Sequence, residues 1–128
     1  MTTNKAAILI IDDNEDIITM VKMMLEMKGY NVTIKMNTNQ IEEVIRDVQP
    51  DLIIMDMLLS GADGRVICKE LKSNTALSRI PIMMMSAHPN AMHDCLNAGA
   101  DTFLAKPFEI QHFYDAVEKA LSLNQPKQ

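Results

Sequence analysis

Five short apolar runs, each followed by a stretch with helical spacing, constrain the fold of this chain more than any other feature of its sequence. The apolar runs occupy 6–11, 31–36, 52–55, 80–85 and 102–105. The helical patterns occupy 14–28, 38–48, 65–73, 90–97 and 108–123. Strands that alternate with helices are joined by right-handed crossovers, which place the strands in a parallel sheet with helices on both faces. The sequence therefore predicts one doubly wound α/β domain with five strands and five helices.

Length and charge limit what this domain can do. The chain has 128 residues, enough for one compact domain, and we assign 1–123 to it and 124–128 to a polar tail or the stub of a linker. The formal net charge of -5 and the lack of a basic run argue against direct binding of nucleic acid. The first apolar run is too short for a membrane span or a signal peptide, so a cytoplasmic location without membrane contact is expected.

Cysteine and methionine receive structural explanations. The two cysteines, Cys68 and Cys95, form no C-x-x-C pair and adjoin no histidine cluster, so we expect packed or surface thiols in a reducing compartment. Four of the 12 methionines recur at helical spacing, at positions 20, 23, 24 and 27. We expect these four to fill the core rather than to line a binding groove, because methionine adapts to irregular gaps in cores.

Polar side chains follow four of the predicted strands. Asp12 and Asp13 come after the first strand and Asp56 after the third, while Ser86 and Lys106 follow the fourth and fifth. Ligands of open α/β sheets bind at the carboxyl ends of the strands, so these side chains are expected to converge on one rim. Each residue alone is explained as a helix cap or a turn residue. Caps and turns give no reason, however, to gather three acids and a lysine around one crevice.

The predicted cluster has a definite chemistry. Neighbouring carboxylates repel and raise one another's pKa unless a cation joins them, and their hard oxygens suit Mg²⁺. With Mg²⁺ and Lys106 to neutralise phosphoryl oxygens, and with the Ser86 hydroxyl to donate to a third, Asp56 would act as a nucleophile and form an acyl phosphate. The cluster is therefore predicted to accept a phosphoryl group on Asp56.

Short motifs surround these residues in a fixed order along the chain. They are Ile-Asp-Asp-Asn at 11–14, Asp-Leu-Ile-Ile-Met-Asp at 51–56, Asp-Gly at 63–64, Met-Met-Ser-Ala at 84–87, Gly-Ala-Asp at 99–101 and Ala-Lys-Pro-Phe at 105–108. With them the chain resembles the receiver domains of two-component response regulators from Ile8 to Leu121. The resemblance implies a flavodoxin-like sheet with strand order 2-1-3-4-5. It also implies a signalling domain that promotes only its own phosphorylation and dephosphorylation, not an enzyme that acts on other molecules.

The resemblance assigns ligands for the expected Mg²⁺. Asp13 would bind the ion directly and Asp12 mainly through water, while Asp56 would serve as phosphoacceptor and as a metal ligand. The backbone carbonyl of Leu58 would be the remaining protein ligand, so that the Leu58 side chain need not be polar.

The resemblance also assigns a switch. Lys106 would pair with the phosphoryl group through a cis peptide bond to Pro107, and Ser86 would be the hydroxyl drawn toward the phosphate after transfer. Phe103 matches the aromatic position that rotates inward with it, although a plain core aromatic explains that residue almost as well. Leu58 and His88 occupy two variable rim positions that tune the phosphoryl lifetime, and Ser60 stands where a proline is common.

The expected partners are a histidine kinase or a histidine phosphotransfer protein as donor and a downstream effector or output domain as receiver of the signal. The oligomeric state is expected to be a monomer or a phosphorylation-dependent dimer.

Three alternatives remain open on the sequence. A degenerate receiver would act only as a protein-docking module. A flavodoxin-like nucleotide or flavin binder would need a Gly/Ser/Thr-rich loop where Asp12 and Asp13 stand. A phosphatase of the haloacid dehalogenase type would need a general acid at the position of Leu58.

Overall fold

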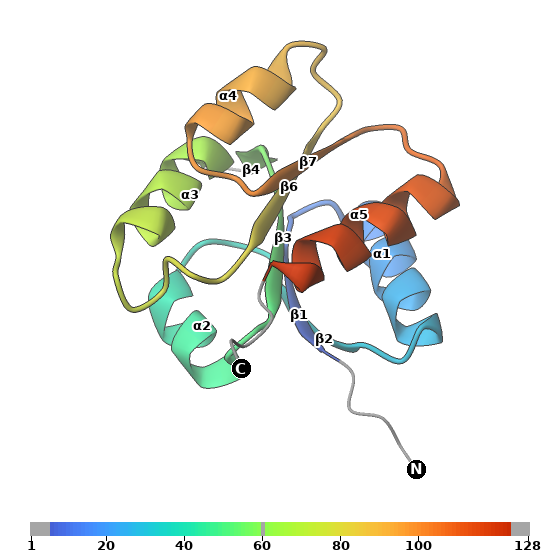
Figure 1. Cartoon of the computed structure of the whole chain (residues 1–128), viewed down its shortest axis with the longest axis horizontal. Helices are drawn as coiled ribbons and strands as arrows, with labels where there is room; N and C mark the ends of the chain where they lie inside the picture. Colours follow the sequence, from blue (N-terminus) through green and yellow to red (C-terminus); the bar gives the residue numbers. More distant parts are fainter. Residues whose placement is uncertain (1–5, 60, 124–128) are drawn as a thin grey trace.

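A five-stranded parallel sheet, in the order β2-β1-β3-β6-β7, forms the centre of the computed structural model (Figure 1). The model describes residues 6–59 and 61–123. The strands of this sheet are β1 (Ala7–Ile11), β2 (Asn31–Lys35), β3 (Leu52–Asp56), β6 (Ile82–Ser86) and β7 (Thr102–Ala105). The helices are α1 (Glu15–Met27), α2 (Ile41–Val48), α3 (Gly64–Ser73), α4 (Ala91–Asn97) and α5 (Ile110–Ser122). Because β6 and β7 are the fourth and fifth strands of the sheet, the predicted order 2-1-3-4-5 is confirmed.

Helices cover both faces of the sheet, α1 and α5 on one side and α2, α3 and α4 on the other (Figure 1). The alternation of side chains along each strand builds the two cores. In β1, Ile8 and Ile10 pack with the α1 and α5 side chains, while Leu9 and Ile11 pack with those of the other three helices. The strand β1 is thus apolar on both faces, which explains why it reads as a continuous apolar run.

Two strands were not predicted. The segment after β3 forms a short antiparallel pair, β4 (Leu58–Leu59) with β5 (Ala62–Asp63), between the third predicted strand and the third predicted helix. Two-residue strands carry no periodicity that a sequence pattern could reveal. The pair begins two positions after Asp56 and so fixes the path of the chain beside it.

Local hydrogen bonds set the first turns of two helices. The Asn14 side chain caps α1 by accepting from the Ile17 N–H at 3.1 Å. The second helix begins at Ile41, three residues later than predicted. The Asn37 side chain accepts the Asn39 N–H at 2.9 Å and forms a turn that competes with the helix.

The prediction for the methionines of α1 was wrong for three of them. Met24 is buried, but Met20, Met23 and Met27 have exposed fractions of 39%, 55% and 76%. These three stand at i, i+3 and i+7 and form a stripe of their own, while Val21 and Leu25 fill the stripe that faces the sheet. Helical spacing identified an apolar face without saying which of two such faces was inside.

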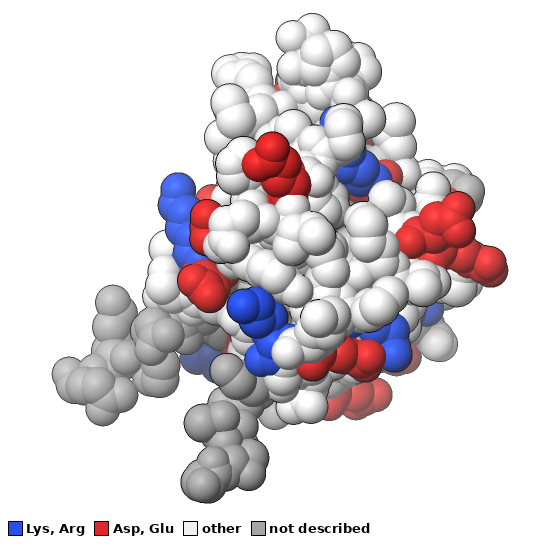
Figure 2. Space-filling model, turned by 90° about the vertical axis from the view of Figure 1, so that its right-hand side faces the viewer, with Lys and Arg blue, Asp and Glu red and all other residues white. Residues whose placement is uncertain are grey.

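The α1 and α5 side of the molecule carries scattered charges of both signs. Figure 2 looks onto this side and shows small groups of acidic and basic side chains with uncharged areas between them, not a continuous basic surface. The exposed methionines of α1 and the exposed Ile110 of α5 contribute apolar surface.

Within the described residues, no helix is both long enough and apolar enough to cross a membrane.

Both cysteines are packed thiols. Cys68 and Cys95 are buried and free in the core under α3 and α4, in agreement with the prediction. Burial raises the pKa of Cys68 to about 11. The thiol is therefore protonated and unreactive at neutral pH.

Candidate functional site

The predicted site residues converge on one rim of the sheet. Asp12 follows the last residue of β1, Asp56 ends β3, Ser86 ends β6, and Lys106 follows β7. All four neighbouring strand pairs in the sheet are parallel, so these ends lie along the same edge. The fold thus brings together side chains that are up to 94 positions apart in the sequence.

An ion pair joins two of these residues at the centre of the rim. Lys106 Nζ lies 2.6 Å from Asp56 Oδ1, and both side chains are largely buried, with exposed fractions of 19% and 14%. Asp56 Oδ2 accepts the backbone N–H of Leu58 at 3.1 Å. The Lys106–Pro107 peptide bond is cis, as the resemblance implied. The Asp56 carboxylate is therefore held in one orientation and faces a cation.

Asp12 is the least satisfied polar group of the rim. Its side chain is 1% exposed, its Oδ1 accepts the Asn14 N–H at 2.9 Å, and its Oδ2 has no hydrogen-bond partner among the described residues. Burial raises the pKa of Asp12 above its ordinary value, and the Asp56 and Asp13 carboxylates raise it further. The Asn14 N–H and the charge of Lys106 act in the opposite direction. A buried carboxylate oxygen without a partner destabilises the fold unless a cation or a proton reaches it.

The donor set fits a hard divalent cation. In the part of the chain that the structure describes, no three His, Cys, Asp or Glu side chains come together closely enough to enclose an ion by themselves. Mg²⁺ does not require such a cage, because it keeps several waters and binds one or two carboxylates plus phosphate oxygens. The unpartnered oxygen of Asp12 beside the Asp56 carboxylate provides this kind of partial site.

The other predicted residues surround the ion pair. Ser86 is buried, and its Oγ accepts the His88 N–H at 3.0 Å, while the Lys106 N–H donates to the Ser86 carbonyl at 2.9 Å. The second bond ties the end of β6 to the end of β7, and the first holds the Ser86 hydroxyl against the segment that follows β6. Phe103 is half-buried and packs against the core under α3 and α4. Leu58 is exposed on the rim with His88, and Ser60 lies outside the described residues.

Gly64 shapes the site in a way that the sequence reading missed. A Cβ at this position would overlap the backbone carbonyl oxygen of Asp56 and would lie 3.0 Å from that of Met57. The Gly64 N–H donates to the same Met57 carbonyl at 2.6 Å. The first turn of α3 therefore presses directly on the acceptor loop. The available signal was a glycine directly after the helix-capping Asp63, a place where helix propensity alone gives no reason for glycine.

Comparison with known proteins identifies the family. The model of the family described as "Response regulator receiver domain" matches residues 8–118, and the chain belongs to this family. The phosphate regulon transcriptional regulatory protein PhoB of Pseudomonas aeruginosa is 39% identical over 103 residues, which cover 79% of this chain and 45% of PhoB. The DNA-binding dual master transcriptional regulator RpaA of Synechocystis is 33% identical over 116 residues, covering 89% of this chain and 48% of RpaA. The chain thus spans about half the length of these relatives.

Solved structures show the same fold. A two-component response regulator from Clostridium difficile superposes with a TM-score of 0.82 at 29% identity, covering 92% of this chain and 97% of that one. The receiver domain of a sensor histidine kinase from Pseudomonas aeruginosa gives a TM-score of 0.83 at 28% identity, covering 92% and 98%. That structure has a magnesium ion coordinated in its active site cleft. The present chain is therefore a receiver domain of two-component signalling with a flavodoxin-like fold.

Proposed function

We propose that this receiver domain takes a phosphoryl group onto Asp56 from a phosphohistidine of a histidine kinase or a histidine phosphotransfer protein. The observation that supports the proposal most strongly is the Lys106–Asp56 ion pair at 2.6 Å, at the rim where ligands of such sheets bind. A largely buried lysine that holds a carboxylate in place both orients the nucleophile and provides a positive charge for an incoming phosphoryl oxygen.

The transfer exchanges one bond for another. A carboxylate oxygen of Asp56 attacks the phosphorus atom, a P–O bond forms, and the P–N bond to the donor histidine breaks. The histidine nitrogen leaves with the bonding electron pair and takes up a proton from solvent. Lys106 contacts Asp56 Oδ1, and this contact supports the proposal that its ammonium group then pairs with a phosphoryl oxygen. Because the Asp56 carboxylate has no proton to lose when it attacks, the step needs no general base.

A divalent cation, Mg²⁺ by its preference for hard oxygens, would be held by Asp12, Asp13, Asp56 and the Leu58 carbonyl. When bound, it would supply positive charge that offsets the clustered carboxylates and the phosphoryl oxygens. The unpartnered Oδ2 of Asp12 supports this assignment from the protein side.

Phosphorylation of Asp56 would change the positions of side chains on the neighbouring strands β6 and β7. Ser86 and Phe103 stand at the end of β6 and within β7. We propose that the Ser86 hydroxyl gives up its bond with the His88 N–H to reach the phosphoryl group, and that Phe103 moves inward with it. Such a local charge change biases the surface of α4, β7 and α5 between two arrangements, which a downstream effector or output domain distinguishes.

We propose a downstream effector or an output domain as the receiver of the signal. The relatives PhoB and RpaA are named as transcriptional regulators and are about twice as long as the matched region. We propose that this chain signals to an output of some kind without touching nucleic acid, as a monomer or a phosphorylation-dependent dimer. A cytoplasmic location stays a prediction from the sequence. The flavin-binding and phosphatase alternatives receive no support from the family match.

A direct test measures the intact mass of the purified protein after incubation with acetyl phosphate or phosphoramidate, with Mg²⁺ or with a chelator. The expected result is the gain of one phosphoryl mass that requires Mg²⁺ and disappears in Asp56→Asn. Asp51→Asn, at the other end of the same strand, is the matched control and should gain the mass. A wild type that gains no mass from these donors or from a phosphorylated histidine phosphotransfer protein would favour the docking-module alternative.

A further inference from the structure

A cavity lies at the opposite end of the sheet from the candidate site. It has a volume of about 530 Å³ and opens between the end of α2 and the connection from α3 to β6. Its wall includes Pro50 and Asp51, directly before β3, so the length of that strand, roughly 16 Å at ~3.3 Å per residue, separates it from Asp56. The volume falls in the range of ligand pockets, about 300–1,000 Å³. Neither the predicted site residues nor the proposed phosphotransfer uses this cavity.

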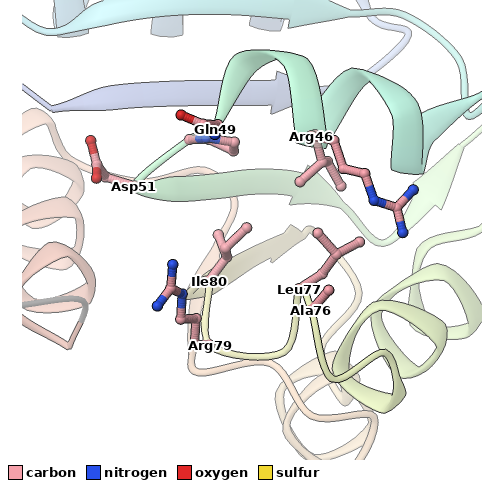
Figure 3. A pocket seen from close by; sticks show the side chains of 9 residues that line it. Arg46, Gln49, Asp51, Ala76, Leu77, Arg79 and Ile80 are labelled. Atoms are coloured by element: carbon pink, nitrogen blue, oxygen red, sulfur yellow. The ribbon is translucent and has the colours of Figure 1, made fainter.

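The cavity combines an apolar floor with cationic ends. Ile45 and Leu77 are buried in its floor, and Ile80 is half-buried beside them. Figure 3 shows Arg46 and Arg79 on opposite sides of these apolar side chains, Arg46 on α2 and Arg79 on the connection before β6. A molecule that fills the cavity would meet hydrocarbon in the middle and a guanidinium group toward each end.

The two guanidinium groups have few contacts with other side chains among the described residues. Arg79 has no hydrogen-bond or ion-pair partner among the described residues. Arg46 has one long contact, 3.7 Å to Glu42 on the same helix, in which both side chains are about half exposed. The lining holds two arginines against one acid, Asp51, whose carboxylate accepts the Ala7 N–H at 2.8 Å, so basic side chains are in excess there. In a chain with a net charge of -5, the cavity is therefore a local site of available positive charge.

We propose that this cavity binds an acidic peptide segment of a partner protein, with an apolar side chain on the floor and carboxylates near the two arginines. Guanidinium groups bind carboxylates through paired, charge-assisted hydrogen bonds, which gives both affinity and orientation. Two cations separated by apolar side chains match acidic residues that flank leucine-like residues. The cavity is open to solvent, which suits a segment that continues into a larger chain. The site is a docking surface independent of phosphoryl transfer.

The test is a titration of ¹⁵N-labelled full chain with the peptide acetyl-Glu-Leu-Leu-Glu-amide, followed through backbone amide shifts. We expect shifts confined to residues 45–51 and 76–80 and a dissociation constant of about 1 mM or below, the range of a single short segment. The peptide with Gln in place of both Glu residues should bind about ten-fold more weakly, because the charge-assisted bonds are lost.

Variants locate the interaction. Arg79→Gln should weaken binding about ten-fold, whereas Lys119→Gln on α5, which removes the same charge elsewhere, should leave it unchanged. The amide spectrum of each variant reports directly whether it is folded. The proposal is overturned if the peptide causes no shifts at these residues, if the Gln peptide binds equally well, or if Arg79→Gln binds like the wild type. Binding that persists in Asp56→Asn separates this site from phosphoryl transfer.

Discussion

The two ends of the parallel sheet both carry aspartates, yet they use them in opposite ways. At the amino-terminal end, Asp51 accepts the Ala7 N–H at 2.8 Å, and Asp101 accepts the Ile82 N–H at 2.9 Å and pairs with Lys72 at 2.7 Å. At the carboxyl-terminal end, Asp12 is almost fully buried with one oxygen unpartnered, and its pKa is raised. The aspartates at the amino end have hydrogen-bond partners for their carboxylates, whereas Asp12 at the carboxyl end has an oxygen without one among the described residues.

The difference follows from the direction of the strands. The amino end of a parallel sheet presents unpaired N–H groups, which carboxylates neutralise, whereas the carboxyl end presents carbonyl oxygens, which they do not. Acids at the carboxyl end must therefore find another cation. Lys106 serves Asp56, and Asp12 has no such partner among the described residues. The carboxyl end thus holds acids that stay available for a metal and a phosphoryl group, at a cost in stability.

Removal of the lysine should produce the largest effect at the carboxyl end. Lys106→Ala deletes the cation that faces Asp56 and would face the phosphoryl oxygens, so the rate of phosphorylation by acetyl phosphate should fall about 10²-fold or more. Time courses of intact mass measure this rate. Lys72→Ala, the lysine of the amino end, should leave the rate within about two-fold of the wild type per folded molecule. A Lys106→Ala variant phosphorylated at the normal rate would contradict the assigned role.

Removal of a paired carboxylate at the amino end should lower the free energy of unfolding rather than the rate of phosphorylation. Asp101→Asn removes the charge that pairs with Lys72 and weakens the bond to the Ile82 N–H, so the free energy of unfolding should fall by about 2 kcal/mol. Urea denaturation checks this value. The exposed Asp115 of α5 offers a control, since Asp115→Asn should change stability by no more than about 0.5 kcal/mol. Equal losses for the two variants would show that the amino-end network adds no stability.

Removal of the charge of Asp12 at the carboxyl end should raise the free energy of unfolding slightly. Asp12→Asn removes a buried charge and should increase the free energy of unfolding of the metal-free protein by about 1 kcal/mol at pH 7. The pKa of Asp12 is higher in the folded state than in the unfolded state. The ionised carboxylate therefore lowers the free energy of unfolding by its full amount above the folded-state pKa, and this loss disappears as the pH falls below the ordinary value of 3.8. The gain from Asp12→Asn should disappear over the same range.

Metal addition sharpens this prediction. Mg²⁺ that binds only the folded state should raise the Tm of the wild type in proportion to the logarithm of its concentration, and Asp12→Asn should suppress that increase. Thermal unfolding with Mg²⁺ titrated against a chelator is the measurement. A wild type whose Tm ignores Mg²⁺, or a variant that responds like the wild type, would remove Asp12 from the metal site.

The sequence predicted the elements and the rim better than it predicted surfaces and close approaches. Asp56 and Lys106 could be placed together because apolar runs locate strand ends and parallel topology brings those ends to one edge. The exposure of Met20 and Met23 could not be predicted, because α1 carries two apolar stripes and only packing decides which one is inside. The contact of Gly64 with the Asp56 carbonyl also depends on a three-dimensional approach that no local pattern encodes.

The most direct measurement identifies the residue that carries the phosphoryl group. Protein treated with acetyl phosphate and Mg²⁺ would be reduced with borohydride, which converts an aspartyl phosphate into homoserine, and then digested and sequenced by tandem mass spectrometry. The account predicts homoserine at position 56, with Asp12, Asp13 and Asp51 unchanged. Homoserine at any of those three positions, or a stable phosphate ester on Ser86, would contradict the assignment of Asp56 as the acceptor.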